Sequence, residues 1–146
     1  MPLMAKNTTC EFEEVYKDGQ IQNGTILLAT NKLRYEYYND KLFTIIYNKQ
    51  WNIIDNIHHR EIPNATDQNI KILNKIKTYF QEYPNTPNKI VESEYELIFN
   101  QKINQEFLND ITIKSHRLNM KIYFHDCKFD LINDYFFSVK PFFKLK

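Results

Sequence analysis

His125 and Cys127 are the residues whose types and spacing come nearest to a catalytic pair. They stand two positions apart, so on a regular strand they would share a face and form a Cys–His nucleophile pair. Such a pair also needs an orienting third group and an oxyanion site. The shared face, however, carries Asn119, Lys121 and Tyr123, which marks it as the solvated side. A small hydrolase built on Cys127 and His125 is therefore the weakest of three functional hypotheses.

The other candidate groups favour structural interpretations. His58 and His59 are adjacent, and neighbouring residues of a strand point to opposite sides, so the two rings cannot easily bind one metal ion. Glu92, Glu94 and Glu96 lie along one side of a predicted strand, where paired carboxylates can catalyse hydrolysis, but such rows are more often solvated edges. We therefore expect no enzyme activity, no metal ion and no cofactor.

The composition excludes several classes of protein. The chain of 146 residues is long enough for one domain with one hydrophobic core. Its 19 basic and 18 acidic residues give a net charge of +1, which argues against a dedicated nucleic-acid binder. No apolar run approaches the length that crosses a bilayer. Gly19 and Gly24 are the only glycines and fit no phosphate-binding loop, which excludes P-loop and Rossmann enzymes.

Alternation of apolar and polar residues predicts a protein built mainly of strands. The alternation is clearest over residues 32–37, 91–99 and 118–124, each with one apolar face and one polar face. Less regular strands are expected at residues 10–16, 21–30, 42–47, 51–55, 57–62, 107–113 and 129–139.

One helix is predicted at about residues 67–83. Ile70, Leu73, Ile76 and Phe80 fall on one stripe there, and Pro84 ends the segment. A single helix among many strands argues against an alternating α/β fold. We therefore expect a strongly curved antiparallel meander, an unclosed β-barrel, whose concave apolar face is covered by this helix. That face is either a filled core or an aromatic-lined ligand cavity.

A resemblance to a known family comes from the order of strands between Gly24 and Ile62. The strand patterns are GTILL at 24–28, LRYEY at 33–37, LFTII at 42–46 and WNIID at 51–55. This order resembles the periplasmic outer-membrane lipoprotein carrier (LolA-type) family. The sequence FFSVKPFF at 136–143 resembles the Phe-rich final strand of that family. The resemblance extends loosely over residues 11–145.

The resemblance implies an unclosed β-barrel with a helical lid over a hydrophobic cavity. In such a carrier the cavity takes the acyl chains of a lipoprotein from an inner-membrane ABC transporter and passes them to an outer-membrane receptor. The implied location is the periplasm, although residues 1–7 lack the basic-then-apolar layout of a secretory signal, and the implied state is a monomer. A periplasmic location would permit a disulfide between Cys10 and Cys127.

The sequence also departs from the family pattern. Ala29 and Thr30 stand where the family has Arg-Pro, so Arg34 is the remaining candidate for contact with the lid or with a ligand headgroup. The helix expected ahead of the first strand has no counterpart in residues 1–9, which we interpret as a flexible N-terminus or a remnant of a trimmed chain. Residues 10–146 would then form the single half-barrel domain.

The leading hypothesis is therefore a carrier that binds acyl chains, with neither nucleic-acid binding nor a membrane-spanning segment. The alternative is a non-enzymatic protein-interaction module with a fully packed β core. The residues predicted to line the acyl cavity are Leu33, Tyr35, Tyr37, Ile45, Trp51, Ile53, Leu97, Phe99, Met120, Ile122 and Phe124.

Overall fold

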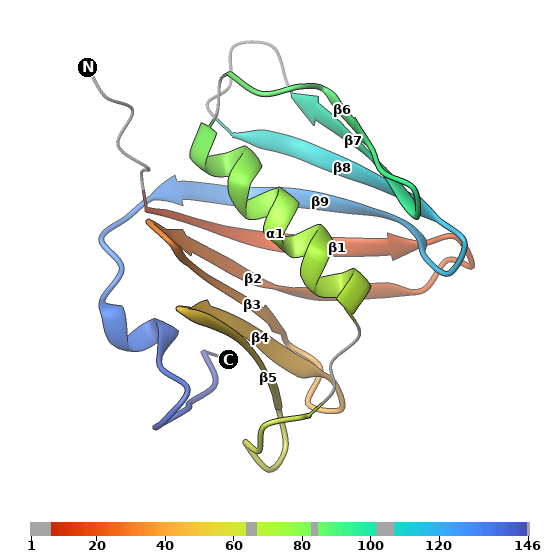
Figure 1. Cartoon of the computed structure of the whole chain (residues 1–146). Coiled ribbons are helices and arrows are strands. Elements are labelled where there is room, and N and C mark those ends of the chain that lie inside the picture. Colours follow the sequence, from red (N-terminus) through yellow and green to blue (C-terminus); the bar gives the residue numbers. More distant parts are fainter. Residues whose placement is uncertain (1–6, 64–66, 83–84, 102–106, 146) are drawn as a thin grey trace.

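A single antiparallel sheet dominates the computed structural model, which describes residues 7–63, 67–82, 85–101 and 107–145 (Figure 1). The one α-helix within these residues is α1 (Asp67–Glu82), and a short 3-10 helix spans Asp134–Phe137. The strands are β1 (Thr8–Tyr16), β2 (Ile21–Ala29), β3 (Lys32–Tyr37), β4 (Phe43–Asn48), β5 (Gln50–Asp55), β6 (Lys89–Val91), β7 (Tyr95–Gln101), β8 (Leu108–Ser115) and β9 (Asn119–Phe129).

Two meanders, β1–β5 and β6–β9, make up the sheet. They are joined by the pairing of β1 with β9, the first and last strands in the sequence. The strand order is β5-β4-β3-β2-β1-β9-β8-β7-β6, with every neighbouring pair antiparallel. The chain passes from one outer strand, β5, to the other, β6, through α1, which crosses the hollow of the curved sheet (Figure 1). The sheet is strongly curved and is not closed into a barrel. The predicted fold class is confirmed, with the pairing of β1 and β9 as the added long-range contact.

The concave face of the sheet and one side of α1 form the main core. Ile72, Leu73 and Ile76 of the helix are buried against the apolar faces of strands from both meanders. Aromatic rings fix the second half of α1, because Tyr79 stacks on Phe99 with ring centroids 4.0 Å apart. The predicted helix thus lies where the periodicity placed it, and residue 83 falls outside the described residues.

A second, smaller core lies on the convex face. There Leu27, Ile46 and Ile54 are buried under the C-terminal segment, residues 130–145, from which Phe137 is fully buried. The strand predicted at 129–139 is therefore wrong beyond Phe129. Its apolar residues do not extend the sheet but cover it, because β2, β4 and β5 present apolar side chains on the convex face as well as on the concave face.

Two further expectations about chain segments need correction. Residues 57–62 form a turn that returns to the sheet only through a bridge between Ile54 and Glu61, so the strand predicted there is wrong. Thr8 and Thr9 already belong to β1, so residues 1–9 are not all a flexible tail, and residues 1–6 lie outside the described part of the chain. None of the described helices is long and apolar enough to span a membrane.

A bulge in β9 overturns the prediction that His125 and Cys127 share a face of the strand. Asp126 has a positive φ of 51°, and the register between β1 and β9 shifts there. The extra residue reverses the alternation, so His125 faces the convex side while Cys127 packs against the concave core. Cys127 forms a disulfide with Cys10, which removes the thiol that a hydrolase would need. We therefore abandon the hydrolase hypothesis.

Candidate functional site

A buried carboxylate on the concave face is the central feature of the site. Alternation along β1 places Cys10, Phe12 and Glu14 on the side that faces α1, and only 1% of Glu14 is exposed. Three tyrosine hydroxyls donate to the carboxylate. Tyr16 and Tyr35 each donate to one oxygen, and Tyr37 bridges both at 3.0 and 2.7 Å.

The registers of the strands explain how these groups meet. Tyr35 and Tyr37 are two residues apart on β3, so both rings lie on the concave face and reach across β2 toward β1. Gly24 of β2 stands opposite both Phe12 and Tyr37. A Cβ atom at this position would lie only 2.3 Å from the ring of Phe12. The missing side chain thus leaves room for Phe12, which stacks on Tyr35 with centroids 4.0 Å apart.

Burial dominates the electrostatics of the group. It raises the pKa of Glu14 above its ordinary value, and the hydrogen bonds from Tyr16, Tyr35 and Tyr37 oppose this only in part. The pKa values of Tyr35 and Tyr37 are raised well above normal, first by burial and then by the nearby Glu14 charge. The tyrosines therefore stay protonated and act as hydrogen-bond donors.

A cavity of about 70 Å³ separates this group from α1. It lies toward the end of the sheet that carries the β1–β2 and β8–β9 turns, where its lining residues Tyr16, Leu118 and Met120 are only half-buried. Its walls are apolar apart from the Glu14 group and Asn69. The lining consists of Glu14, Tyr16, Tyr35, Tyr37, Ile45, Asn69, Ile72, Leu73, Ile76, Ile113, Leu118, Met120 and Ile122.

All eleven residues predicted to line an acyl cavity lie in the concave core. Trp51 and Met120 are partly buried and the other nine are buried. The structure brings five of them to the present cavity, namely Tyr35, Tyr37, Ile45, Met120 and Ile122. The others pack elsewhere along the same face. Their role in binding a ligand stays a prediction.

Sequence reasoning missed Glu14, although a signal was present. The alternation of Cys10, Phe12 and Glu14 puts a carboxylate at a position where the strand otherwise turns apolar side chains to the core. A charged residue at such a position is rarely buried without a partner. The tyrosines of β3 supply the hydrogen bonds, but the pattern alone does not reveal that they reach it.

Arg34 lies on the opposite face from this cavity. Its guanidinium is fully buried under the C-terminal segment, where it pairs with Glu36 and donates to the carbonyl oxygens of Phe136 and Phe143. Arg34 also lies over the ring of Phe142, 5.1 Å from its centroid. In this arrangement Arg34 holds the C-terminal segment, and its predicted contact with a lid or headgroup stays a prediction.

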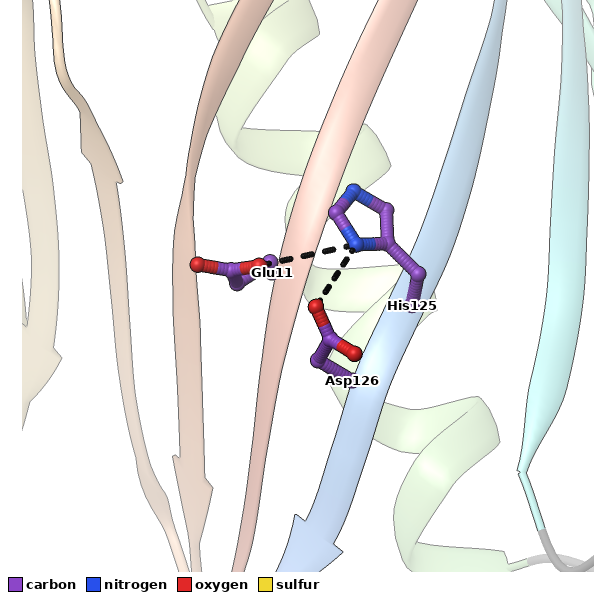
Figure 2. A group of neighbouring side chains, drawn as sticks. All are labelled: Glu11, His125 and Asp126. Carbon is purple, nitrogen blue, oxygen red and sulfur yellow. Dashed lines mark hydrogen bonds and ion pairs between the residues drawn. The ribbon is translucent and has the colours of Figure 1, made fainter.

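A second polar cluster lies on the convex face, where the β9 bulge turns His125 and Asp126 toward Glu11 of β1 (Figure 2). The Nδ1 atom of His125 lies 3.5 Å from Glu11 and 3.3 Å from Asp126. One ligand atom from each residue falls within 4.8 Å of the others, and imidazole with carboxylates is a set that zinc accepts. His125 and Asp126 are exposed, and the contacts within the cluster already account for the side-chain positions.

Neither a family model nor a curated protein matches this chain. Any inference about the function of this protein therefore rests mainly on the geometry of the concave face. Among the described residues, α1 covers this apolar face, and the cavity between them is polar only at the Glu14 group and Asn69.

Proposed function

We propose that the protein is a non-enzymatic carrier that holds the acyl chains of a lipoprotein between α1 and the concave face of the sheet. The observation that carries this proposal is the helix itself. An open sheet exposes a wide apolar face, and among the described residues α1 alone covers it by crossing from β5 to β6 (Figure 1). A face covered in this way can be uncovered by moving one element.

The size of the cavity sets the mechanism. Pockets for small molecules are typically about 300–1,000 Å³, so a cavity of about 70 Å³ cannot hold an acyl chain. Binding must therefore displace α1, and the acyl chains must take the place of Ile72, Leu73 and Ile76. Apolar contact is non-directional, so methylene groups can replace these side chains at little net cost. The free protein would then be the form in which α1 fills its own site.

The proposal includes transport through the periplasm between an inner-membrane ABC transporter and an outer-membrane receptor. This part rests on the resemblance at residues 24–62, because residues 136–143 cover the convex face and do not form the final strand that the family pattern implies. The disulfide between Cys10 and Cys127 supports it, because such bonds persist in oxidising compartments and are rare in the cytosol. The Cys10–Cys127 disulfide thus favours the periplasm, which the strand patterns alone do not specify.

A second candidate function is a protein-interaction module with a packed core. The observation that favours it is the same small cavity, because a concave face filled this well needs no ligand. The two candidates differ in what α1 does. In a carrier α1 moves to admit acyl chains, whereas in an interaction module it is a permanent part of the core.

A titration with a diacylated lipopeptide tests the carrier. Trp51 is the only tryptophan and lies half-buried against the concave core, 4.8 Å from the ring of Tyr47, so its fluorescence reports on this face. We expect a saturable change with the lipopeptide and none with the same peptide lacking its acyl chains. The absence of any response, with no lipid in native mass spectra, would favour the interaction module.

Two matched variants locate the binding. Met120→Phe fills the cavity and should weaken binding of the lipopeptide, because the added ring occupies space that the ligand needs. Val91→Phe adds a ring to a residue of β6 that is 69% exposed and should leave binding unchanged. Equal binding by both variants would place the ligand elsewhere.

A further inference from the structure

In the part of the chain that the structure describes, the buried Glu14 carboxylate has hydrogen bonds but no partner of opposite charge. Among the described residues, every contact to its oxygens comes from a tyrosine hydroxyl, and no lysine, arginine or histidine forms an ion pair with it. Lys77, a buried cation of α1, lies over the ring of Tyr47 instead. Arg34 is paired with Glu36 on the other face. A carboxylate in this position is unfavourable when ionised unless a cation joins it.

The space next to Glu14 fits a small polar group. A water-sized group needs roughly 10–15 Å³ of such space, so about 70 Å³ accommodates an ammonium group and the carbon that bears it. The half-buried rim formed by Tyr16 and Met120 allows the rest of a ligand to extend along the face that α1 covers. The cavity thus has the size of a polar headgroup and is too small for an acyl chain.

The tyrosines complete the chemistry of a cation site. Each hydroxyl donates a hydrogen bond to Glu14, so the lone pairs of the three phenol oxygens remain as acceptors. The rings of Tyr35 and Tyr37, whose centroids lie 5.5 Å apart in an edge-to-face contact, also line the cavity, and aromatic rings attract cations. Carboxylate, phenol oxygens and aromatic rings are the combination that recognises a primary ammonium group.

We infer that the Glu14 cavity selects acylated ligands that carry a primary ammonium group, which it pairs with the Glu14 carboxylate. This inference rests on the proposed carrier function and names the headgroup that the carrier accepts. The ammonium can come from two sources, the free α-amine of a diacylated lipopeptide or the amine of an ethanolamine phospholipid. Both present an N–H cation next to acyl chains.

The test compares amine and blocked forms of each ligand on the full chain. Wild-type protein is titrated with a diacylated lipopeptide and its N-acetylated form, and separately with lysophosphatidylethanolamine and its N-acetylated form, following Trp51 fluorescence. We expect the amine form to bind about 10- to 100-fold more tightly than the blocked form in at least one pair, as for hydrogen bonds to a charged group. The pair that shows the difference identifies the source.

Two variants assign the selectivity to one carboxylate. Glu14→Gln keeps the size and a hydrogen-bond acceptor but removes the charge, and should abolish the preference for the amine. Glu13→Gln makes the same change on the next residue, which faces the convex side, and should keep the preference.

The outcomes separate this inference from the proposed function. If wild-type protein binds amine and blocked forms equally, the ammonium site is wrong and the carrier stands. A preference that survives Glu14→Gln also overturns the site. If no acylated ligand binds wild-type protein, both proposals fail. The comparison of ligands on wild-type protein decides the question even where Glu14→Gln does not fold.

Discussion

Arg34 and Glu36 form an ion pair on the convex face of β3 in which neither side chain has exposed surface. Arg34 donates to the carbonyl of Phe136 at 2.9 Å, and the backbone amide of Leu145 donates to both oxygens of Glu36 at 3.1 Å. The pair thus fastens the C-terminal segment at two points. Tyr35, which lies between them in the chain, points to the other face and binds Glu14. Strand β3 therefore supplies partners to buried charged groups on both faces of the sheet: the Arg34–Glu36 pair on the convex face and Glu14 of β1 on the concave face.

Loss of Arg34 should be strongly destabilising. Arg34→Met would leave the Glu36 carboxylate buried without a cation, and removing one member of a buried pair costs about 3–5 kcal/mol. Urea unfolding followed by circular dichroism measures the change in the free energy of unfolding. Lys32→Met is the matched control, because its partner Asp134 is 85% exposed and the expected loss is less than about 1 kcal/mol. Similar losses in the two variants would contradict the account.

Glu14 should make the stability of the protein depend on pH. Burial raises the pKa of Glu14 in the folded state, so the folded protein holds this proton more tightly than the unfolded chain does. Its contribution is fully present below the ordinary value of about 4.5 and is lost as the pH rises through the folded value. The other titratable groups at the carboxylate are Tyr16, Tyr35 and Tyr37, while α1, β8 and β9 contribute uncharged side chains to the cavity.

Glu14→Gln provides the measurement. Its side chain does not titrate, so the stability of wild-type protein relative to the variant should fall as the pH rises above about 4.5. Thermal or urea unfolding over a series of pH values gives this difference directly. A difference that stays constant, or that grows in favour of wild-type protein, would show that burial does not control the carboxylate.

The disulfide between Cys10 and Cys127 should contribute a large share of the stability. It joins residues 117 positions apart, and a closed loop of this length is expected to stabilise the folded state by about 4–5 kcal/mol. The double variant Cys10→Ala/Cys127→Ala should unfold at a correspondingly lower urea concentration. Denatured wild-type protein should show no free thiol until it is reduced. Free thiols in the unreduced protein would refute the bond itself.

The concave face could be predicted because it follows from local alternation. Leu33 and Tyr35, like Leu97 and Phe99, are two residues apart, and a period of two fixes which side of a strand they occupy. The stripe of Leu73 and Ile76 likewise fixes the buried side of α1. These patterns require only that a strand or helix be regular.

The rest of the fold depends on features that alternation does not contain. The bulge at Asp126 adds one residue to β9, so His125 and Cys127 face opposite sides despite their even spacing. The convex core needs a partner for Ile46 and Ile54, and that partner, Phe137, lies 91 and 83 residues later in the chain. Runs of adjacent apolar residues in β2, β4 and β5 were the available signal that both faces are covered.

The central claim, that acyl chains bind by displacing α1, is tested most directly by fixing α1 to the sheet. Lys75 of α1 lies 3.3 Å from Glu92, and both side chains are about two-fifths exposed, so a carbodiimide can join them without adding a spacer. Lys75→Gln, treated identically, keeps every other reactive pair and serves as the control. The protein is then titrated with the diacylated lipopeptide while Trp51 fluorescence is followed. We expect saturable binding by untreated wild-type protein and by the treated variant, and loss of binding once Lys75 and Glu92 are joined. Undiminished binding by the joined protein would contradict it.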